Sequence, residues 1–312
     1  MGPARRDKDP LERFTAAVTV GGFRTGAALA RIVPGFVAEG LVTPIGFGAS
    51  FANVERRAMI ERHLMRVNPH WGPFRLRQAV QDAFDSYTRY WIEALRLPTL
   101  SDRAIERGIE VEGYHRITEG LSRGKGVILA LPHMGGWEWA GRWLSVRGHR
   151  TTVIVEQLDP PELFEWFTRL REDLGMTVVA LGPGAASAIA KALNDNQIVC
   201  LLSDRDITGG GVEVEFFGET TTLPAGPATL ALRTGAPLLP VGVYFTPRLH
   251  GHVAVVRPPV PAAREGRLRD DVGRVTQALA RELESLIRRA PEQWHLFQPN
   301  WPSDPGYVRR PR

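Results

Sequence analysis

Short apolar runs alternate with helical stretches over the C-terminal two thirds of the chain. The runs are apolar almost throughout, as strands buried on both faces of a sheet must be. Strands that alternate with helices predict an α/β fold with a central, mostly parallel, buried sheet and helices on both of its faces. The expected strands are residues 126–131, 152–155, 177–181, 198–202, 238–245 and 252–256, and the expected helices are residues 136–148, 161–174, 184–195, 225–235 and 270–289.

The N-terminal part has a different pattern. Residues 14–52 are rich in Ala, Gly, Val, Phe and Leu with breaks at Pro34 and Pro44, which indicates short apolar helices, and residues 55–97 also read as helical. Arg24 and Arg31 interrupt the apolar stretch, so no window supplies the ~20 apolar residues of a spanning helix. We therefore expect helices that lie on a membrane surface with the apolar face down. Packing of these helices on the core is the alternative.

Composition limits the broad class. The chain has 312 residues, of which 43% are hydrophobic and 23% charged, an ordinary globular balance. We interpret it as one domain, residues 1–312, with a helical membrane-surface segment at 1–100 and an α/β catalytic core at 105–302. The first thirteen residues mix acidic and basic side chains and do not resemble a signal peptide. Cys200 lies in an expected strand and is interpreted as a buried residue. The Pro- and Arg-rich tail from residue 298 is expected to be loosely ordered.

The charge is basic, with a net value of +5 and a pI of about 9.8. Apart from Lys8, Lys125 and Lys191, every Lys or Arg position is an arginine. Nucleic acid, an anionic membrane surface or an acidic ligand could each account for such a charge, and a compositional bias toward arginine could as well. The arginines are spread along the chain without a cluster interleaved with aromatic residues, so we expect no nucleic-acid partner.

Candidate chemistry follows the strand at 126–131. His133 comes after Pro132, and Gly135 and Gly136 separate it from Glu138 at the start of the next helix. Ligands of open α/β sheets bind beyond the carboxyl ends of the strands, which is where His133 would lie. Residues five apart do not share a helix face, so His133 must precede the helix and Glu138 must open it. Glu138 could then orient the imidazole, which would act as a general base on a hydroxyl.

Other interpretations of the same residues stay open. A histidine after a strand and a glutamate in a first helical turn also occur by chance, because acidic residues are favoured there. A metal site is disfavoured because no third ligand has a suitable spacing, so we expect no metal. The Gly-x-Ser-x-Gly elbow of serine hydrolases is absent. A non-catalytic membrane lipid-binding protein remains an alternative to an enzyme.

Taken together, several segments resemble the bacterial lipid A and glycerolipid acyltransferases. The spacing from His133 to Glu138 resembles their His-x4-Asp/Glu motif, and Arg171 falls near an arginine of the lipid A enzymes. The resemblance covers roughly residues 105–302. The remaining segments that carry it are residues 202–206 (LSDRD), 214–218 (VEFFG), 223–227 (LPAGP), 234–240 (TGAPLLP) and 291–295 (PEQWH), together with Trp301. Within this family the chain is most similar to the actinobacterial phosphatidylinositol mannoside acyltransferases.

The resemblance implies an acyl-CoA-dependent O-acyltransferase that is peripheral on the cytoplasmic face of the cell membrane. It implies transfer of a long, palmitoyl-like chain from acyl-CoA to the 6-hydroxyl of a mannose on the inositol phospholipid. Acyl-CoA would be a co-substrate, with no further cofactor. The transfer would be direct, because no activated nucleophile is evident. Another glycolipid or lysophospholipid hydroxyl is the alternative acceptor.

Roles can be assigned as hypotheses. His133 is the base and Glu138 its orienting group, and backbone N–H groups near Gly135, Gly136 or the helix start could form an oxyanion hole. The substrate-binding candidates are Arg171, which could also pair with Asp204 or Asp206, together with Asp204, Arg205 and Asp206 after the strand at 198–202 and Glu156 after the strand at 152–155. Ion pairing or capping is the plainer alternative for each.

Overall fold

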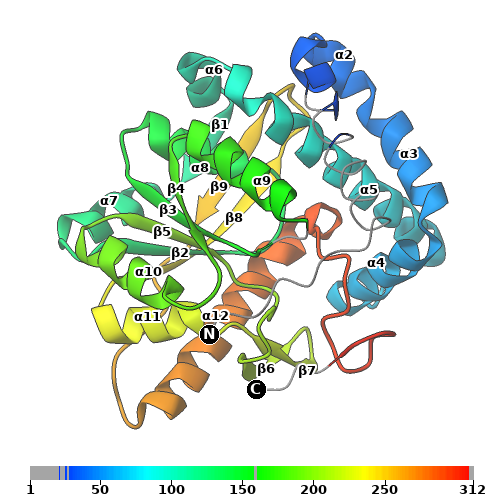
Figure 1. The fold of residues 1–312 in the computed structure, drawn as a ribbon. Helices are drawn as coiled ribbons and strands as arrows, with labels where there is room; N and C mark the ends of the chain where they lie inside the picture. The colour runs from blue at the N-terminus through cyan, green and yellow to red at the C-terminus, as the bar shows by residue number, and fades with distance from the viewer. Residues whose placement is uncertain (1–20, 22–24, 27, 158–159, 309–312) are drawn as a thin grey trace, which may run out of the picture.

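A seven-stranded sheet forms the centre of the part of the chain that the structure describes (Figure 1). The computed structural model describes residues 21, 25–26, 28–157 and 160–308. Expectations that concern residues 1–20, Arg24 and residues 309–312 lie outside the described residues. The sheet order is β1-β9-β8-β2-β5-β3-β4. The strands are β1 (Ile109–Glu112), β2 (Val127–Leu131), β3 (Thr151–Val155), β4 (Met176–Ala180), β5 (Ile198–Leu202), β8 (Leu238–Phe245) and β9 (His252–Val256).

Five of these strands run parallel, and the hairpin-like pair of β8 and β9 is antiparallel. At the edge, β1 pairs in parallel with β9. The expected fold class is thus confirmed, and the six expected strands are present within one residue of their predicted ends. The strand β1 was not predicted, because its sequence Ile-Glu-Val-Glu is short and half polar, as an edge strand is.

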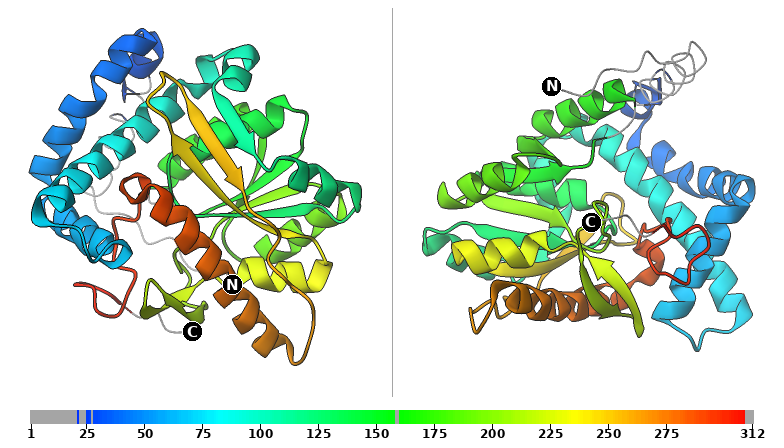
Figure 2. Two further views of the ribbon diagram at one scale, coloured as in Figure 1. Left: turned by 180° about the vertical axis from the view of Figure 1, so that it is seen from behind. Right: turned by 60° about the horizontal axis from the view of Figure 1, so that its bottom comes forward.

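Successive side chains of a strand point to opposite faces of the sheet. Because the central strands are apolar at successive positions, both faces of the sheet are apolar and are covered by helices. On β2, Ile128 and Ala130 pack with residues of α10 (Ala185–Asn194), α11 (Gly226–Thr234) and α12 (Leu268–Arg289). Val127, Leu129 and Leu131 pack on the other face with α6 (Asp102–Arg107), α7 (His115–Ser122) and α8 (Trp137–Val146). Figure 2 shows α12 crossing the face opposite α8. The helix α9 (Pro161–Asp173) packs beside β4.

An N-terminal layer of helices lies along one side of the sheet (Figures 1 and 2). It contains α2 (Gly35–Gly40), α3 (Val42–Ala52), α4 (Val54–Val67) and α5 (Pro73–Arg96), and the 3-10 turn η1 (Leu97–Thr99) follows. The contact of α3 with α5 is close, since a Cβ on Gly46 would lie 2.2 Å from Oδ1 of Asp85. The predicted helical character of this part is therefore confirmed for its described residues.

The outer side of this layer is apolar. Exposed residues here include Ile32, Phe36, Phe47 and Phe51, with 79%, 72%, 63% and 78% of their surface accessible. Among the described residues, the 18-residue stretch Gly35–Ala52 is long and apolar enough by composition to cross a membrane, which differs from the expectation that no window would suffice. Core helices and signal sequences meet the same criterion. A turn at Leu41 separates α2 from α3 within the stretch.

Two features of the C-terminal third of the chain were not predicted. The antiparallel hairpin of β6 (Val212–Phe216) and β7 (Glu219–Leu223) stands apart from the main sheet and packs against α12. After α12 and the turn η2 (Pro291–Gln293), the chain crosses back toward α4. The expectation of a loose tail is wrong up to Asp304, because Trp301 is fully buried and Asp304 nearly so.

Candidate active site

His133 lies just beyond the carboxyl end of β2, on the wall of a cavity of about 730 Å³. The chain turns sharply there before α8 begins. Gly135 has a φ of +56°, and a Cβ at this position would lie 2.0 Å from the carbonyl oxygen of Val243, so only glycine fits. The turn leaves 23% of the His133 side chain exposed. The expected position of this histidine before the helix, with Glu138 in its first turn, matches the structure.

Asp204, and not Glu138, accepts the hydrogen bond of the His133 ring. The strands β2 and β5 are parallel neighbours with Leu131 opposite Leu202, so His133 and Asp204 each follow their strand by two residues. Nδ1 of His133 lies 2.6 Å from Oδ1 of Asp204, and the backbone N–H of His133 donates to Oδ2 at 3.0 Å. No hydrogen bond joins Glu138 to His133 among the described residues. The carboxylate that lies in position to orient the His133 ring is therefore that of Asp204, whereas we expected Glu138.

The environment of Asp204 keeps it ionised. Its side chain has no exposed surface. Burial alone would raise the pKa of this carboxyl, but the His133 ring, the Trp294 indole and the His133 backbone N–H together hold the pKa below its ordinary value. An ionised carboxylate only accepts hydrogen bonds, so the proton between the pair resides on Nδ1 of His133. When the imidazole is neutral, its other ring nitrogen, Nε2, carries the free lone pair that a general base needs.

Glu138 forms a second charged pair on the cavity wall. Its Oε1 accepts from Nη2 of Arg171 at 2.5 Å and from the hydroxyl of Tyr90 at 3.3 Å. Burial would lower the pKa of Arg171, but the charge of Glu138 raises it, so the guanidinium remains a cation. Burial also raises the pKa of Tyr90 well above its ordinary value, which keeps the phenol neutral. Arg171 therefore pairs with Glu138, and not with Asp204 or Asp206 as its alternative prediction had it.

The remaining expected site residues also line the cavity, with different partners. Arg205 contacts Glu156 at 3.3 Å, and both side chains retain partial exposure. The carboxylate of Asp206 accepts backbone N–H groups from its own loop, at Thr208, Gly209 and Gly211. The geometry of Asp206 is therefore that of a residue that shapes a loop. The N–H of Gly135 donates to the carbonyl of Gln293 at 3.0 Å, so it is not free to bind an oxyanion as we expected.

The deeper wall of the cavity is apolar. Side chains from β2, β3, β5 and α8 line it, among them Leu129, Leu131, Trp143, Val153 and Cys200. Burial raises the pKa of the Cys200 thiol to about 12, so the thiol remains neutral. Cys200 lies in β5 as predicted, but it is only partly buried because it lines the cavity. Among the residues that the structure describes, no group of three or more His, Cys, Asp or Glu side chains could hold a metal ion.

Three aromatic residues belong to the site although sequence reasoning gave them no role in it. Trp137 meets His133 edge to face at 5.9 Å between ring centroids and stacks on Tyr90 at 4.1 Å. The indole N–H of Trp294 donates to Oδ2 of Asp204 at 2.7 Å. Trp294 was recognised only as part of the closing motif at residues 291–295. Its distance of 90 positions from Asp204 hides the contact from any local pattern.

Comparison with known proteins agrees with this architecture. The family model of the bacterial lipid A biosynthesis acyltransferases matches residues 17–303. The chain is 36% identical to the phosphatidylinositol mannoside acyltransferase of Mycobacterium tuberculosis, over 97% of this chain and 95% of that protein. The enzyme of the same name from Mycolicibacterium smegmatis is also 36% identical, over 95% of each chain. A lipid A biosynthesis acyltransferase of Haemophilus influenzae is 22% identical over 85% of this chain and 82% of its own length. The expectation of an acyltransferase is thus confirmed, and the chain belongs to the bacterial lipid A biosynthesis acyltransferase family.

Proposed function

We propose that this enzyme transfers a long acyl chain from acyl-CoA to the 6-hydroxyl of a mannose on a phosphatidylinositol mannoside. The observation that carries the proposal is the His133–Asp204 pair at the wall of a large apolar cavity. Ligand pockets for small molecules span roughly 300–1,000 Å³, so a cavity of about 730 Å³ suits a long chain. The names of the mycobacterial relatives support the choice of acceptor.

In the proposed reaction, Nε2 of His133 removes the proton of the acceptor hydroxyl as its oxygen attacks the thioester carbonyl. The resulting imidazolium is stabilised by Asp204 through Nδ1. The tetrahedral intermediate then collapses, the C–S bond breaks, and His133 returns the proton to the sulfur of the leaving thiolate. No acyl-enzyme forms, because the thiol of the one cysteine of the chain is held neutral.

The polar residues of the cavity supply charge and hydrogen bonds. Arg171 places a positive charge on the wall, where it can stabilise the oxyanion, and Glu138 holds Arg171 in place. Glu156 and Arg205 are suited to bind sugar hydroxyls, since both line the cavity and are partly exposed. The roles of Asp204 and Asp206 become orientation of His133 and support of the loop, in place of direct contact with substrate.

We place the protein on the membrane surface, on its cytoplasmic face and as a peripheral protein. The exposed phenylalanines of α2 and α3 would enter the lipid boundary, and the arginine-rich surface would be attracted to anionic headgroups. The fatty substrate and the lipid acceptor would then reach the cavity from the same surface.

The test is acyl transfer from radiolabelled palmitoyl-CoA to a mannosylated phosphatidylinositol, with wild type, His133→Ala and His70→Ala compared. His70 is exposed and serves as the matched control. The proposal expects the lipid to be labelled by wild type and the control, and not by His133→Ala. If all three label it equally, His133 is not the base.

If wild type hydrolyses the thioester through His133 but labels only another glycolipid or a lysophospholipid, the acceptor is different and the chemistry stands. Lipid binding that survives in His133→Ala, without turnover by any of the three, would favour a non-catalytic lipid-binding protein.

A further inference from the structure

The carboxylate of Asp204 is held at both oxygens. Oδ1 faces Nδ1 of His133, and Oδ2 accepts the backbone N–H of His133 and the indole N–H of Trp294. A buried carboxylate can rotate unless donors fix its plane, and charge-assisted bonds of this kind are the strong ones. The 2.7 Å bond of Trp294 is the one side-chain donor to Oδ2 within the described residues. Together with the backbone N–H of His133, it therefore fixes the plane of the Asp204 carboxylate.

Trp294 is itself fixed by the segment that follows α12. Met134 and Trp294 form an antiparallel bridge, the N–H of Gly135 donates to Gln293, and the N–H of His295 donates to the carbonyl of His133 at 2.7 Å. The backbone on either side of His133 is thus tied to residues 293–295. This short segment contacts both His133 and Asp204, although it belongs to neither β2 nor β5. We name residues 293–304 the strap.

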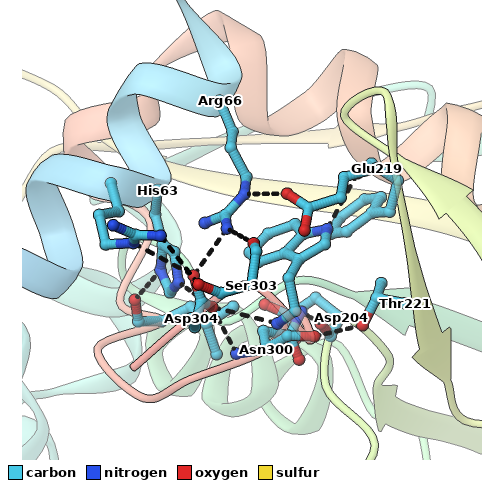
Figure 3. A network of polar contacts seen from close by, with 12 residues as sticks. His63, Arg66, Asp204, Glu219, Thr221, Asn300, Ser303 and Asp304 are labelled. Carbon is cyan, nitrogen blue, oxygen red and sulfur yellow. Dashed lines mark hydrogen bonds and ion pairs between the residues drawn. The ribbon is translucent and has the colours of Figure 1, made fainter. Parts of the chain in front are cut away.

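The far end of the strap is anchored by a buried polar network (Figure 3). Asn300 donates through its side-chain amide to the backbone carbonyl of Asp204 at 3.2 Å. Asp304 accepts the backbone N–H groups of Asn300 and Trp301, at 2.9 and 3.1 Å. Two side chains of α4 also contact the Asp304 carboxylate. Arg66 lies 2.7 Å from it, and His63 lies 3.2 Å from it. The strap is therefore attached to α4 at one end and to the His133–Asp204 pair along its length.

We infer that Trp294 is a positioning residue for catalysis, which holds the Asp204 carboxylate in the plane that meets Nδ1 of His133. The inference rests on the proposed role of His133 as the base. Trp294 is buried and is not among the described residues that line the cavity, so we assign it no contact with substrate. Loss of its N–H should therefore lower kcat and leave KM unchanged. A residue that only stabilised the fold would change neither value in protein that remains folded.

Trp301 provides a matched control. It is a fully buried tryptophan of the same strap, and its indole N–H donates to the carbonyl of Phe216 at 3.1 Å, away from Asp204. The substitutions Trp294→Phe and Trp301→Phe each remove one buried indole donor. Because a smaller ring can loosen the core, a third variant carries 3-benzothienylalanine at position 294, which keeps the bicyclic ring and replaces the N–H by sulfur.

Two readouts decide the inference. The first is kcat and KM for acyl transfer, where both variants at position 294 should lose about ten- to a hundredfold in kcat at unchanged KM, because one bond to a charged group is lost. The second is the downfield proton resonance of Nδ1–H in protein labelled with 15N-histidine, identified by its absence in His133→Ala. This resonance should shift in both position-294 variants, whereas Trp301→Phe should retain the wild-type resonance and kcat.

Folded benzothienylalanine protein with wild-type kcat and an unchanged resonance would overturn the inference. An equal loss of kcat in Trp301→Phe would overturn it as well, because the effect would then be one of general packing. If wild type transfers acyl groups to no lipid acceptor, the proposed function fails, and the resonance still decides whether Trp294 positions the pair.

Discussion

His133 and Asp204 stand at equivalent places on neighbouring parallel strands, each two residues past the end, with Nδ1 and Oδ1 2.6 Å apart. This relationship joins the proposed base and the carboxylate that orients it without any local sequence motif. Glu138, which is five residues from His133, faces Arg171 instead. The site thus contains two separate polar pairs, one that we propose for proton transfer and one that places a cation on the cavity wall.

The Glu138–Arg171 pair should behave as a coupled unit. Removal of one partner leaves the other charge buried, so Glu138→Gln and Arg171→Gln should each lower the free energy of unfolding by about 3–5 kcal/mol. The double variant should lose less than the sum of the two, because no isolated charge remains. Urea denaturation of the four proteins measures this coupling. Strictly additive losses would show that the pair does not interact.

Asp304 should make stability depend on pH. Burial would raise its pKa, but His63 and the N–H groups of Asn300 and Trp301 hold the pKa well below its usual range. A lowered pKa adds stability above the unfolded value of about 3.9, and this stability is lost as the pH falls toward the folded pKa. Asp304→Asn should therefore be less stable than wild type at pH 7, and the difference should shrink below about pH 4.

Urea denaturation across pH tests this, with Asp102→Asn as the control. Asp102 forms an exposed pair with Arg142, so its loss should cost less than about 1 kcal/mol at any pH. A difference between wild type and Asp304→Asn that stays constant through the acid range would contradict the assigned role of Asp304.

Chain-length preference should respond to filling the cavity. Ala254 lines it from β9, two strands away from β2, so Ala254→Leu would take up volume. We expect activity with palmitoyl-CoA to fall more than activity with a short-chain acyl-CoA. Ala192→Leu enlarges a buried residue outside the cavity and should lower stability by about 1–3 kcal/mol without changing the ratio of the two activities. If the ratio of palmitoyl-CoA activity to short-chain activity were equal in wild type and both variants, the acyl chain would have to bind elsewhere.

Membrane attachment should depend on the outer side of α2 and α3. Phe36→Ser, Phe47→Ser and Phe51→Ser combined should reduce sedimentation with vesicles that contain anionic lipid, because these rings are 63–78% exposed and would supply the buried apolar area. Leu249→Ser alters an exposed apolar residue of the loop between β8 and β9 and should leave binding intact. Undiminished binding of the triple variant would show that this surface does not contact lipid.

Much of the fold could be predicted because the spacing of apolar residues and the local composition reflect which residues are buried. The six expected strands and the five helices between them carry uninterrupted apolar runs or clear helical spacing, and their ends agree within a few residues. The strand β1 and the hairpin of β6 and β7 escaped because each strand has only four or five residues and none is a continuous apolar run. The tail was misjudged since its Pro and Arg content hides the buried anchors Trp301 and Asp304.

The sequence predicted residues that the structure brings together at the cavity, but not which of them pair. All seven expected residues either line the cavity or lie directly behind His133. Their partners depend on strand order, because β5 lies between β2 and β3 and so brings Asp204 beside His133. An amphipathic helix gives no hint that Arg171 turns toward Glu138. Trp294 could have been found only with the knowledge that the chain returns to β2 after α12.

The central claim is that His133 acts with Asp204, and initial rates of acyl transfer by Asp204→Asn test it most directly. An amide at this place can donate to Nδ1 and would reverse the tautomer, so kcat should fall by about 10³–10⁴-fold at unchanged KM. Asp206→Asn, two residues along the same loop, should remain within about tenfold of wild type, because Asp206 serves its own backbone turn. Folded Asp204→Asn protein with wild-type kcat would contradict the account.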